Sequence, residues 1–162
     1  GPAGLALVII REDLIGIGEP APPAMLDYAT HAKARSLYNT PPTFAVYVAG
    51  LVFQWLLENG GLAAAEERNI AKARLLYDYI DSSDFYLNPV DKADRSRMNV
   101  PFRLANPELE ADFLAGAATN NMVELKGHRS VGGVRASLYN AMPIEGVQAL
   151  VDYMAEFEAQ KG

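Results

Sequence analysis

The order of periodic segments after residue 62 constrains the fold of this chain more than any other feature. Apolar residues recur at helical spacing in three segments, and they alternate with other residues between Met98 and Leu104 as in a half-buried strand. The expected elements are a helix over 62–81, a strand over 98–104, a helix over 106–120, short strands over 123–125 and 134–138, and a helix over 143–162. This order predicts an α+β domain in which helices pack on a small sheet.

The first sixty residues follow a different pattern. Residues 5–11 form a nearly continuous aliphatic run, which is typical of a strand buried on both faces in the sheet of an α/β protein. Residues 44–59 are apolar on most sides and should form a well-buried helix that Gly60-Gly61 ends. We predict three parts: 1–40 as the tail of a large α/β domain, 41–61 as a connector helix and 62–162 as the small α+β domain.

Several polar residues are expected at the surface or at the margin of the sheet. Lys72 falls outside the apolar stripe of its helix, and Arg95-Ser96-Arg97 is typical of a solvated edge. Pro101 has no backbone N–H, so it should lie at a sheet edge or a bulge.

Composition excludes several functions. The net charge of −6 argues against nucleic acid as the main partner. The absence of cysteine and the presence of only two histidines exclude thiolate chemistry and a histidine-rich zinc site. Asp78, Asp81 and Asp84 lack the pattern of a calcium loop, so no metal site is predicted. The longest apolar run, 44–53, is about half of the roughly 20 residues that span a bilayer, which predicts a cytoplasmic protein without a membrane partner.

A cationic, glycine-rich stretch stands out in this acidic chain. Residues 126–137 carry Lys126, His128, Arg129 and Arg135 around three glycines, and they contain no acidic residue. Arginine matches carboxylate and phosphate groups with two parallel donors, and glycine lets the backbone approach a ligand closely. The spacing predicts a site for two anionic groups of one small substrate. A solvated basic hairpin with structural glycines is the alternative.

A second candidate precedes the helix predicted over 44–59. Asn39-Thr40-Pro41 is typical of a helix start, where free amide groups and the helix dipole favour a phosphate. An ordinary helix cap explains the same residues.

Four motifs then occur in order along the chain. They are GPAGL at 1–5, YNTPPTFAVY at 38–47, RSRMNVPF at 95–102 and LKGHRSVGGVRASLYNAMP at 125–143. Together they resemble the phosphoserine aminotransferase family over essentially the whole chain. The resemblance implies a fold-type I, α/β parent enzyme that uses pyridoxal 5′-phosphate (PLP). Such an enzyme transfers an amino group between glutamate and 3-phosphohydroxypyruvate and works as a homodimer. It serves serine biosynthesis, and in many bacteria also vitamin B6 biosynthesis.

The resemblance also implies roles for individual residues. Asn39 and Thr40 resemble the pair that reaches the PLP phosphate of the neighbouring subunit. His128 and Arg129 resemble the pair that binds the substrate phosphate or distal carboxylate, and Arg135 resembles the arginine that holds the α-carboxylate.

The lysine that binds the cofactor covalently lies just upstream of the GPAG motif in this family. That position would precede Gly1, so no catalytic residue is predicted within the chain. We expect a C-terminal portion of the enzyme that is inactive by itself. A non-catalytic anion-binding or interaction module of aminotransferase ancestry is the alternative, and a transaminase for a different acid is a third possibility.

Overall fold

The chain divides into two compact units, Gly1–Asn59 and Gly60–Gly162, in a computed structural model. The structure describes residues 3–18 and 22–162. The first two residues of the GPAGL motif therefore lie outside the described residues. Each unit is described by itself below, and the predicted division at residues 40 and 61 stays a prediction.

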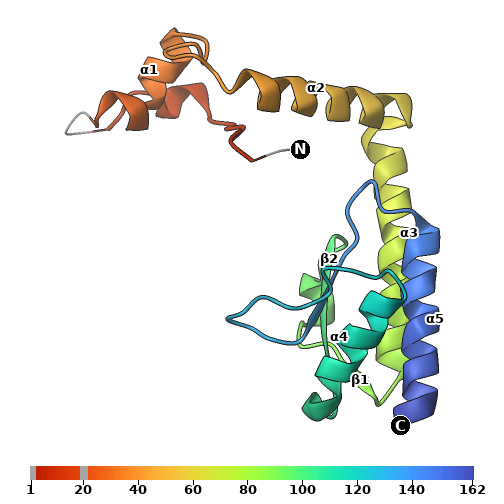
Figure 1. The fold of residues 1–162 in the computed structure, drawn as a ribbon. Coiled ribbons are helices and arrows are strands. Elements are labelled where there is room, and N and C mark those ends of the chain that lie inside the picture. The colour runs from red at the N-terminus through yellow and green to blue at the C-terminus, as the bar shows by residue number, and fades with distance from the viewer. Residues whose placement is uncertain (1–2, 19–21) are drawn as a thin grey trace. The chain divides into compact units, whose positions relative to one another are not determined.

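The second unit has the predicted α+β architecture. Its elements are α3 (Gly61–Ser82), β1 (Tyr86–Leu87), β2 (Asn99–Leu104), α4 (Glu110–Thr119), β3 (Val134–Ser137) and α5 (Ile144–Lys161), with short 3₁₀ turns at Lys92–Asp94 and Pro107–Leu109. The strands form one antiparallel sheet in the order β1-β2-β3. Figure 1 shows α3 and α5 lying side by side along this unit. Asn106 starts the α4 region because its side chain accepts a hydrogen bond from the Glu108 amide, as its sequence pattern indicates.

The core of the second unit lies between the helices and one face of the sheet. Val100, Phe102 and Leu104 alternate along β2 and are almost fully buried, as predicted. Phe102 meets Phe113 of α4 edge-to-face, and both rings contact Tyr86. The opposite face of the sheet therefore carries the residues between them, including Pro101, Arg103 and Arg135.

Pro101 lies on β2, the central strand, but the β1 side of β2 is an unpaired edge at this residue, as predicted. Pro101 pairs with Arg135 of β3, whereas β1 pairs only with Arg103 and Leu104. β1 has thus ended where Pro101 would have to donate, and the side chain of Asn88 donates to the Pro101 carbonyl instead. The strand predicted over 123–125 is not formed. A single bridge between Lys126 and Val134 is the pairing on this side of β3.

Lys72 is buried, although it lies outside the apolar stripe of its helix. The residue is 2% exposed, and its Nζ donates to the backbone oxygens of Leu138, Tyr139 and Met142 at 3.3, 2.7 and 3.0 Å. Burial lowers the pKa of this ammonium group below the ordinary value for lysine. A single cation on α3 therefore fixes the turn that joins β3 to α5.

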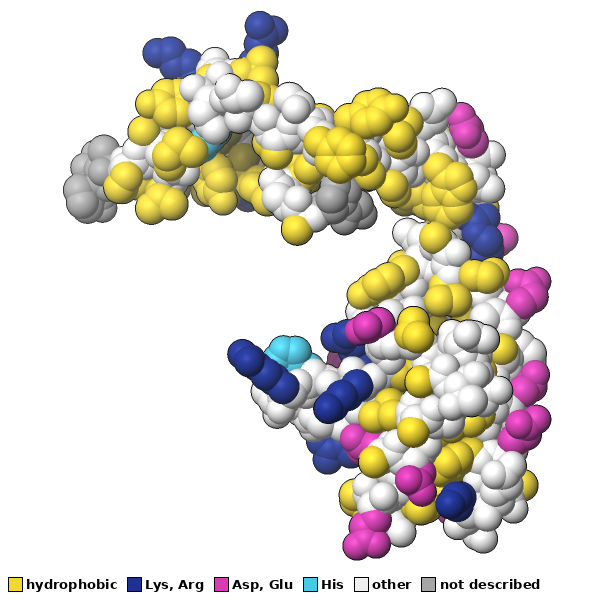
Figure 2. Space-filling view, viewed as in Figure 1, with side chains coloured by type: hydrophobic (Ala, Val, Ile, Leu, Met, Phe, Trp, Pro, Cys, Tyr) yellow, Lys and Arg dark blue, Asp and Glu magenta, His cyan; other side chains and the backbone are white. Residues whose placement is uncertain are grey.

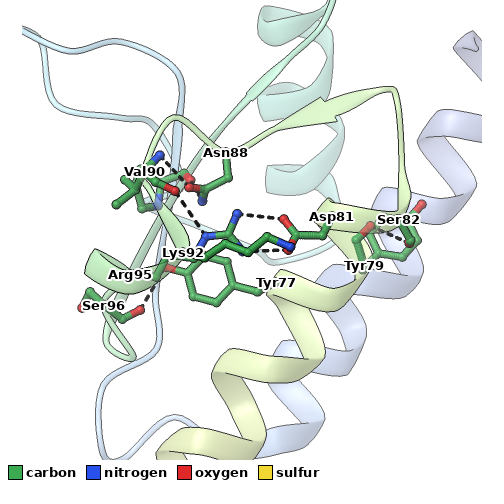
Figure 3. Close-up of polar contacts among 10 residues, drawn as sticks. Tyr77, Tyr79, Asp81, Ser82, Asn88, Val90, Lys92, Arg95 and Ser96 are labelled. Carbon is green, nitrogen blue, oxygen red and sulfur yellow. Dashed lines mark hydrogen bonds and ion pairs between the residues drawn. The ribbon is translucent and has the colours of Figure 1, made fainter.

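Arg95 is likewise not part of a solvated edge. Its guanidinium forms two 2.8 Å bonds with the Asp81 carboxylate and lies over the Tyr77 ring, as Figure 3 shows. Lys92 reaches the same carboxylate at 2.9 Å. These two cations, Arg95 first, lower the pKa of Asp81 to about 2. Asp81, Lys92 and Arg95 thus form one ion-pair network, whereas Arg97 is exposed and pairs with Glu66.

The first unit contains α1 (Tyr28–Lys33), α2 (Thr43–Glu58) and 3₁₀ turns at Glu12–Leu14 and Ala24–Leu26. The helix predicted over 44–59 is confirmed, whereas α1 falls in a stretch for which no element was predicted. Within the described residues, no helix is long and apolar enough to cross a membrane.

Two burial predictions for the first unit are wrong. Residues 5–11 form no strand, and Leu7 and Ile9 are 70% and 92% exposed. A strand needs a neighbour to accept and donate its backbone hydrogen bonds, and the described part of this unit contains none. Along α2 only Ala45 is buried, while Phe44 and Leu57 are largely exposed. The apolar pattern identifies surfaces whose burial is favourable, but no described part of this unit packs against them.

Candidate anion-binding site

The cationic stretch forms a loop whose base is closed by backbone hydrogen bonds. The Arg135 amide donates to the Leu125 oxygen at 2.7 Å, and the Gly127 amide donates to the Gly133 oxygen at 2.8 Å. A Cβ atom at Gly127 would lie 2.1 Å from the Gly132 oxygen. Residue 127 must therefore be glycine for the two sides of the loop to approach this closely. The return strand predicted over 134–138 is confirmed as β3.

The tip of the loop holds the His128 ring against Ser130. The His128 carbonyl accepts hydrogen bonds from the Val131 and Gly132 amides, which makes a tight turn. Its Nδ1 lies 2.7 Å from the Ser130 hydroxyl and accepts from the Ser130 amide at 3.3 Å. A neutral imidazole with Nδ1 as acceptor carries its proton on Nε2, so Nε2–H remains available as a donor. Sequence reasoning did not single out Ser130, although the two-residue spacing from His128 is a local signal for such a contact.

Arg129 and Arg135 have no acidic partner among the described residues. Arg129 is exposed, and Arg135 is half-buried on the outer face of the sheet. The Nε atom of Arg135 is buried, and among the described residues it is the buried side-chain polar atom without a hydrogen-bond partner. A buried unpaired donor carries a free-energy cost that an anion would remove. Figure 2 shows basic and histidine side chains gathered over this protruding loop.

This loop and β3, the strand that follows it, carry three of the five predicted site residues: His128, Arg129 and Arg135. Asn39 and Thr40 belong to the other unit and are exposed. They do not cap α2, because Pro42 is its N-cap and the Asn39 side chain donates to the Thr40 oxygen at 3.3 Å. Consecutive prolines disfavour helical backbone before them, which delays the helix to Thr43. The first amides of α2 have no capping side chain.

The family of the chain follows from comparison with known proteins. Residues 1–150 match the family described as Aminotransferase class-V. The chain belongs to this family. A helical layer on a small antiparallel sheet, with a cationic loop beside it, is thus part of a class-V aminotransferase fold.

The similar proteins are more specific than the family. The phosphoserine aminotransferase of Nitrosomonas europaea is 62% identical over 159 residues, which are 98% of this chain and 43% of that protein. The solved phosphoserine aminotransferase of Bacillus circulans subsp. alkalophilus has a TM-score of 0.89 and 48% identity, covering 94% of this chain and 43% of its own. A PLP-bound phosphoserine aminotransferase from Trichomonas vaginalis has a TM-score of 0.79 and 43% identity. The match covers 85% of this chain and 39% of the Trichomonas chain.

These comparisons confirm the resemblance predicted from the four motifs. The chain spans less than half the length of the curated relatives it matches. The roles predicted for individual site residues stay predictions.

Proposed function

We propose that this chain is part of a PLP-dependent phosphoserine aminotransferase. The enzyme would transfer an amino group between glutamate and 3-phosphohydroxypyruvate and give 2-oxoglutarate and O-phosphoserine. The relatives that cover the whole chain support this activity. The observation that carries the proposal is the buried, unpaired Nε of Arg135 on the strand that follows the loop of His128 and Arg129. A substrate with a phosphate and a carboxylate needs two separate cationic contacts.

The residues of the loop would bind and orient the substrate. Arg129 and the Nε2–H of His128 would donate to the phosphate of O-phosphoserine, or to the distal carboxylate of glutamate. Arg135 would hold the α-carboxylate with its buried Nε and its terminal nitrogens. Fixing both ends of the substrate places its amino group in one orientation, which favours reaction by positioning.

The donors near α2 fit the phosphate of the cofactor. Asn39 and Thr40 are exposed, and the uncapped α2 N-terminus presents amide donors that favour an anion. PLP, when bound, supplies the electron sink for amino-group transfer. We propose that the protein acts as a cytoplasmic homodimer on small molecules, without nucleic acid or membrane partners. We also propose that these 162 residues alone do not turn over substrate, since the resemblance implies a covalent lysine upstream of the GPAG motif.

A chimera tests the assignment of the loop. The N-terminal part of the Nitrosomonas europaea relative would be joined to this chain, and Arg129→Ala would be compared with the parent chimera. Losing charge-assisted hydrogen bonds of about 1.5–3 kcal/mol should raise KM for O-phosphoserine roughly 10- to 150-fold. KM for glutamate should rise less, because its distal carboxylate has less negative charge and fewer acceptor oxygens than a phosphate. An equal change for both substrates would contradict the phosphate role.

The control variant is Arg97→Ala, because Arg97 is an exposed arginine that pairs with Glu66 away from the loop. It removes the same charge and should leave both KM values unchanged. The 162-residue chain, mixed with PLP, glutamate and 3-phosphohydroxypyruvate, should form no 2-oxoglutarate. Formation at the rate of the chimera would show that the chain is catalytically sufficient.

A further inference from the structure

We propose that Arg103 is a positioning residue that holds the anion-binding loop in its binding conformation. Arg103 lies on β2, on the same outer sheet face as Arg135, and is exposed. Its terminal nitrogen donates to the Val131 oxygen at 3.0 Å. This inference rests on the proposed function for the identity of the ligand, but not for the contact.

The register of the sheet brings Arg103 to the loop. Phe102 pairs with Val134, so the neighbour opposite Arg103 is Gly133. A Cβ atom at Gly133 would lie 3.0 Å from Arg103 Cγ and 2.9 Å from the Phe102 oxygen. The missing side chain at Gly133 therefore leaves the space that the Arg103 stem crosses on its way to Val131.

The contact acts on the residues that would bind the anion. The Val131 amide donates to the His128 oxygen at 2.9 Å, so Val131 closes the turn that carries His128 and Arg129. The other side-chain hydrogen bonds of the described loop tip join His128 to Ser130 and stay within the tip. The Arg103–Val131 bond is thus the side-chain hydrogen bond that ties the tip to the sheet. The Arg103 guanidinium also adds positive charge near the proposed phosphate position.

Loss of the Arg103 contact should lower the population of the loop conformation that binds the anion. A ligand that binds one conformation loses affinity in proportion to the population of that conformation. The Arg103–Val131 bond is exposed, so the net strength of a typical protein hydrogen bond applies. This strength corresponds to about a three- to tenfold change in the population. Arg103 should therefore alter affinity without abolishing binding.

The test uses the 162-residue chain with inorganic phosphate as the probe. Arg103→Met keeps the apolar stem and removes the donor, Arg103→Lys keeps charge and a donor, and Arg97→Met is the control for lost charge. Backbone ¹⁵N order parameters report the tip, and amide chemical-shift titration reports phosphate affinity.

In Arg103→Met, we expect lower order parameters at Val131 and Gly132, and about three- to tenfold weaker phosphate binding. The urea midpoint of the second unit should stay unchanged, because Arg103 is exposed. Arg103→Lys should keep order parameters and phosphate affinity close to those of the wild type. Arg97→Met should change neither quantity.

Two results would overturn the inference. One is an Arg103→Met chain with wild-type order parameters at the tip. The other is an Arg97→Met chain that loses as much phosphate affinity, which would show a general effect of charge. A wild-type chain that does not bind phosphate would contradict the proposed function, and the order parameters would still decide whether Arg103 holds the loop.

Discussion

The ion-pair network of Asp81 makes the stability of the second unit depend on pH in a defined way. Arg95 and Lys92 lower the pKa of this carboxyl from 3.8 to about 2. A group whose pKa is lower in the folded state stabilises the fold above its unfolded pKa. That stabilisation is lost as pH falls from about 4 towards 2. Asp81→Asn removes it at every pH.

The size of the effect follows from the pKa difference. The shift corresponds to about 2.4 kcal/mol at neutral pH, at 1.36 kcal/mol for each pKa unit. The Asp81 side chain is 26% exposed, so solvent screens part of the attraction. We therefore expect Asp81→Asn to lower the free energy of unfolding by about 1–2 kcal/mol at pH 7.

Urea unfolding at several pH values measures this difference. The single tryptophan, Trp55, lies on α2 in the first unit, so circular dichroism of the helices is the better probe. The difference between wild type and Asp81→Asn should persist from pH 7 to 5 and shrink below pH 4. Asp78→Asn is the matched control, because Asp78 is an exposed aspartate on the same helix. A loss that is equal in both variants, or independent of pH, would refute the reasoning.

Three further substitutions test the packing and the loop. Lys72→Met should lower the free energy of unfolding by about 2–4 kcal/mol, because three backbone oxygens lose their donor; an unchanged urea midpoint would contradict this. Tyr153→Phe should cost about 1 kcal/mol, since the buried hydroxyl donates to the Phe113 oxygen at 2.7 Å; differential scanning calorimetry measures the change. Gly127→Ala should abolish phosphate-induced amide shifts in the loop while the second unit stays folded, because a Cβ would meet the Gly132 oxygen; retained binding would count against the tight loop base.

The helices and β2 were predictable because their patterns are local. The apolar stripe of α3 can be recognised from residues only three or four positions apart. The Asn106 cap lies directly beside the helix that it starts. Burial of residues 5–11 and of α2 was not predictable in the same way. An apolar sequence shows only that cover is favourable, whereas actual burial depends on what else packs against the segment.

Lys72 and Arg95 show a second limit of local patterns. Lys72 lies outside the apolar stripe, yet its partners lie at residues 138–142, about seventy positions along the chain. Arg95 pairs with Asp81 across a segment that contains β1 and a 3₁₀ turn. Pairings of this kind require the strand register, which sequence spacing does not supply.

The candidate site was found from residue types and motifs. His128, Arg129 and Arg135 appear together because one short loop and the strand after it contain all three. The supporting contacts were missed, because Ser130 acts through a ring orientation and Arg103 reaches Val131 only in the observed register.

The burial of Lys72 gives the chain an internal reporter of core opening. The other lysines, Lys33, Lys92, Lys126 and Lys161, are exposed and would react at once with an amine-directed reagent. Lys72 would react only in molecules whose second unit has opened, so its labelling rate measures that opening under native conditions. Mass spectrometry could thus follow the core of the second unit without a denaturant and without an engineered probe.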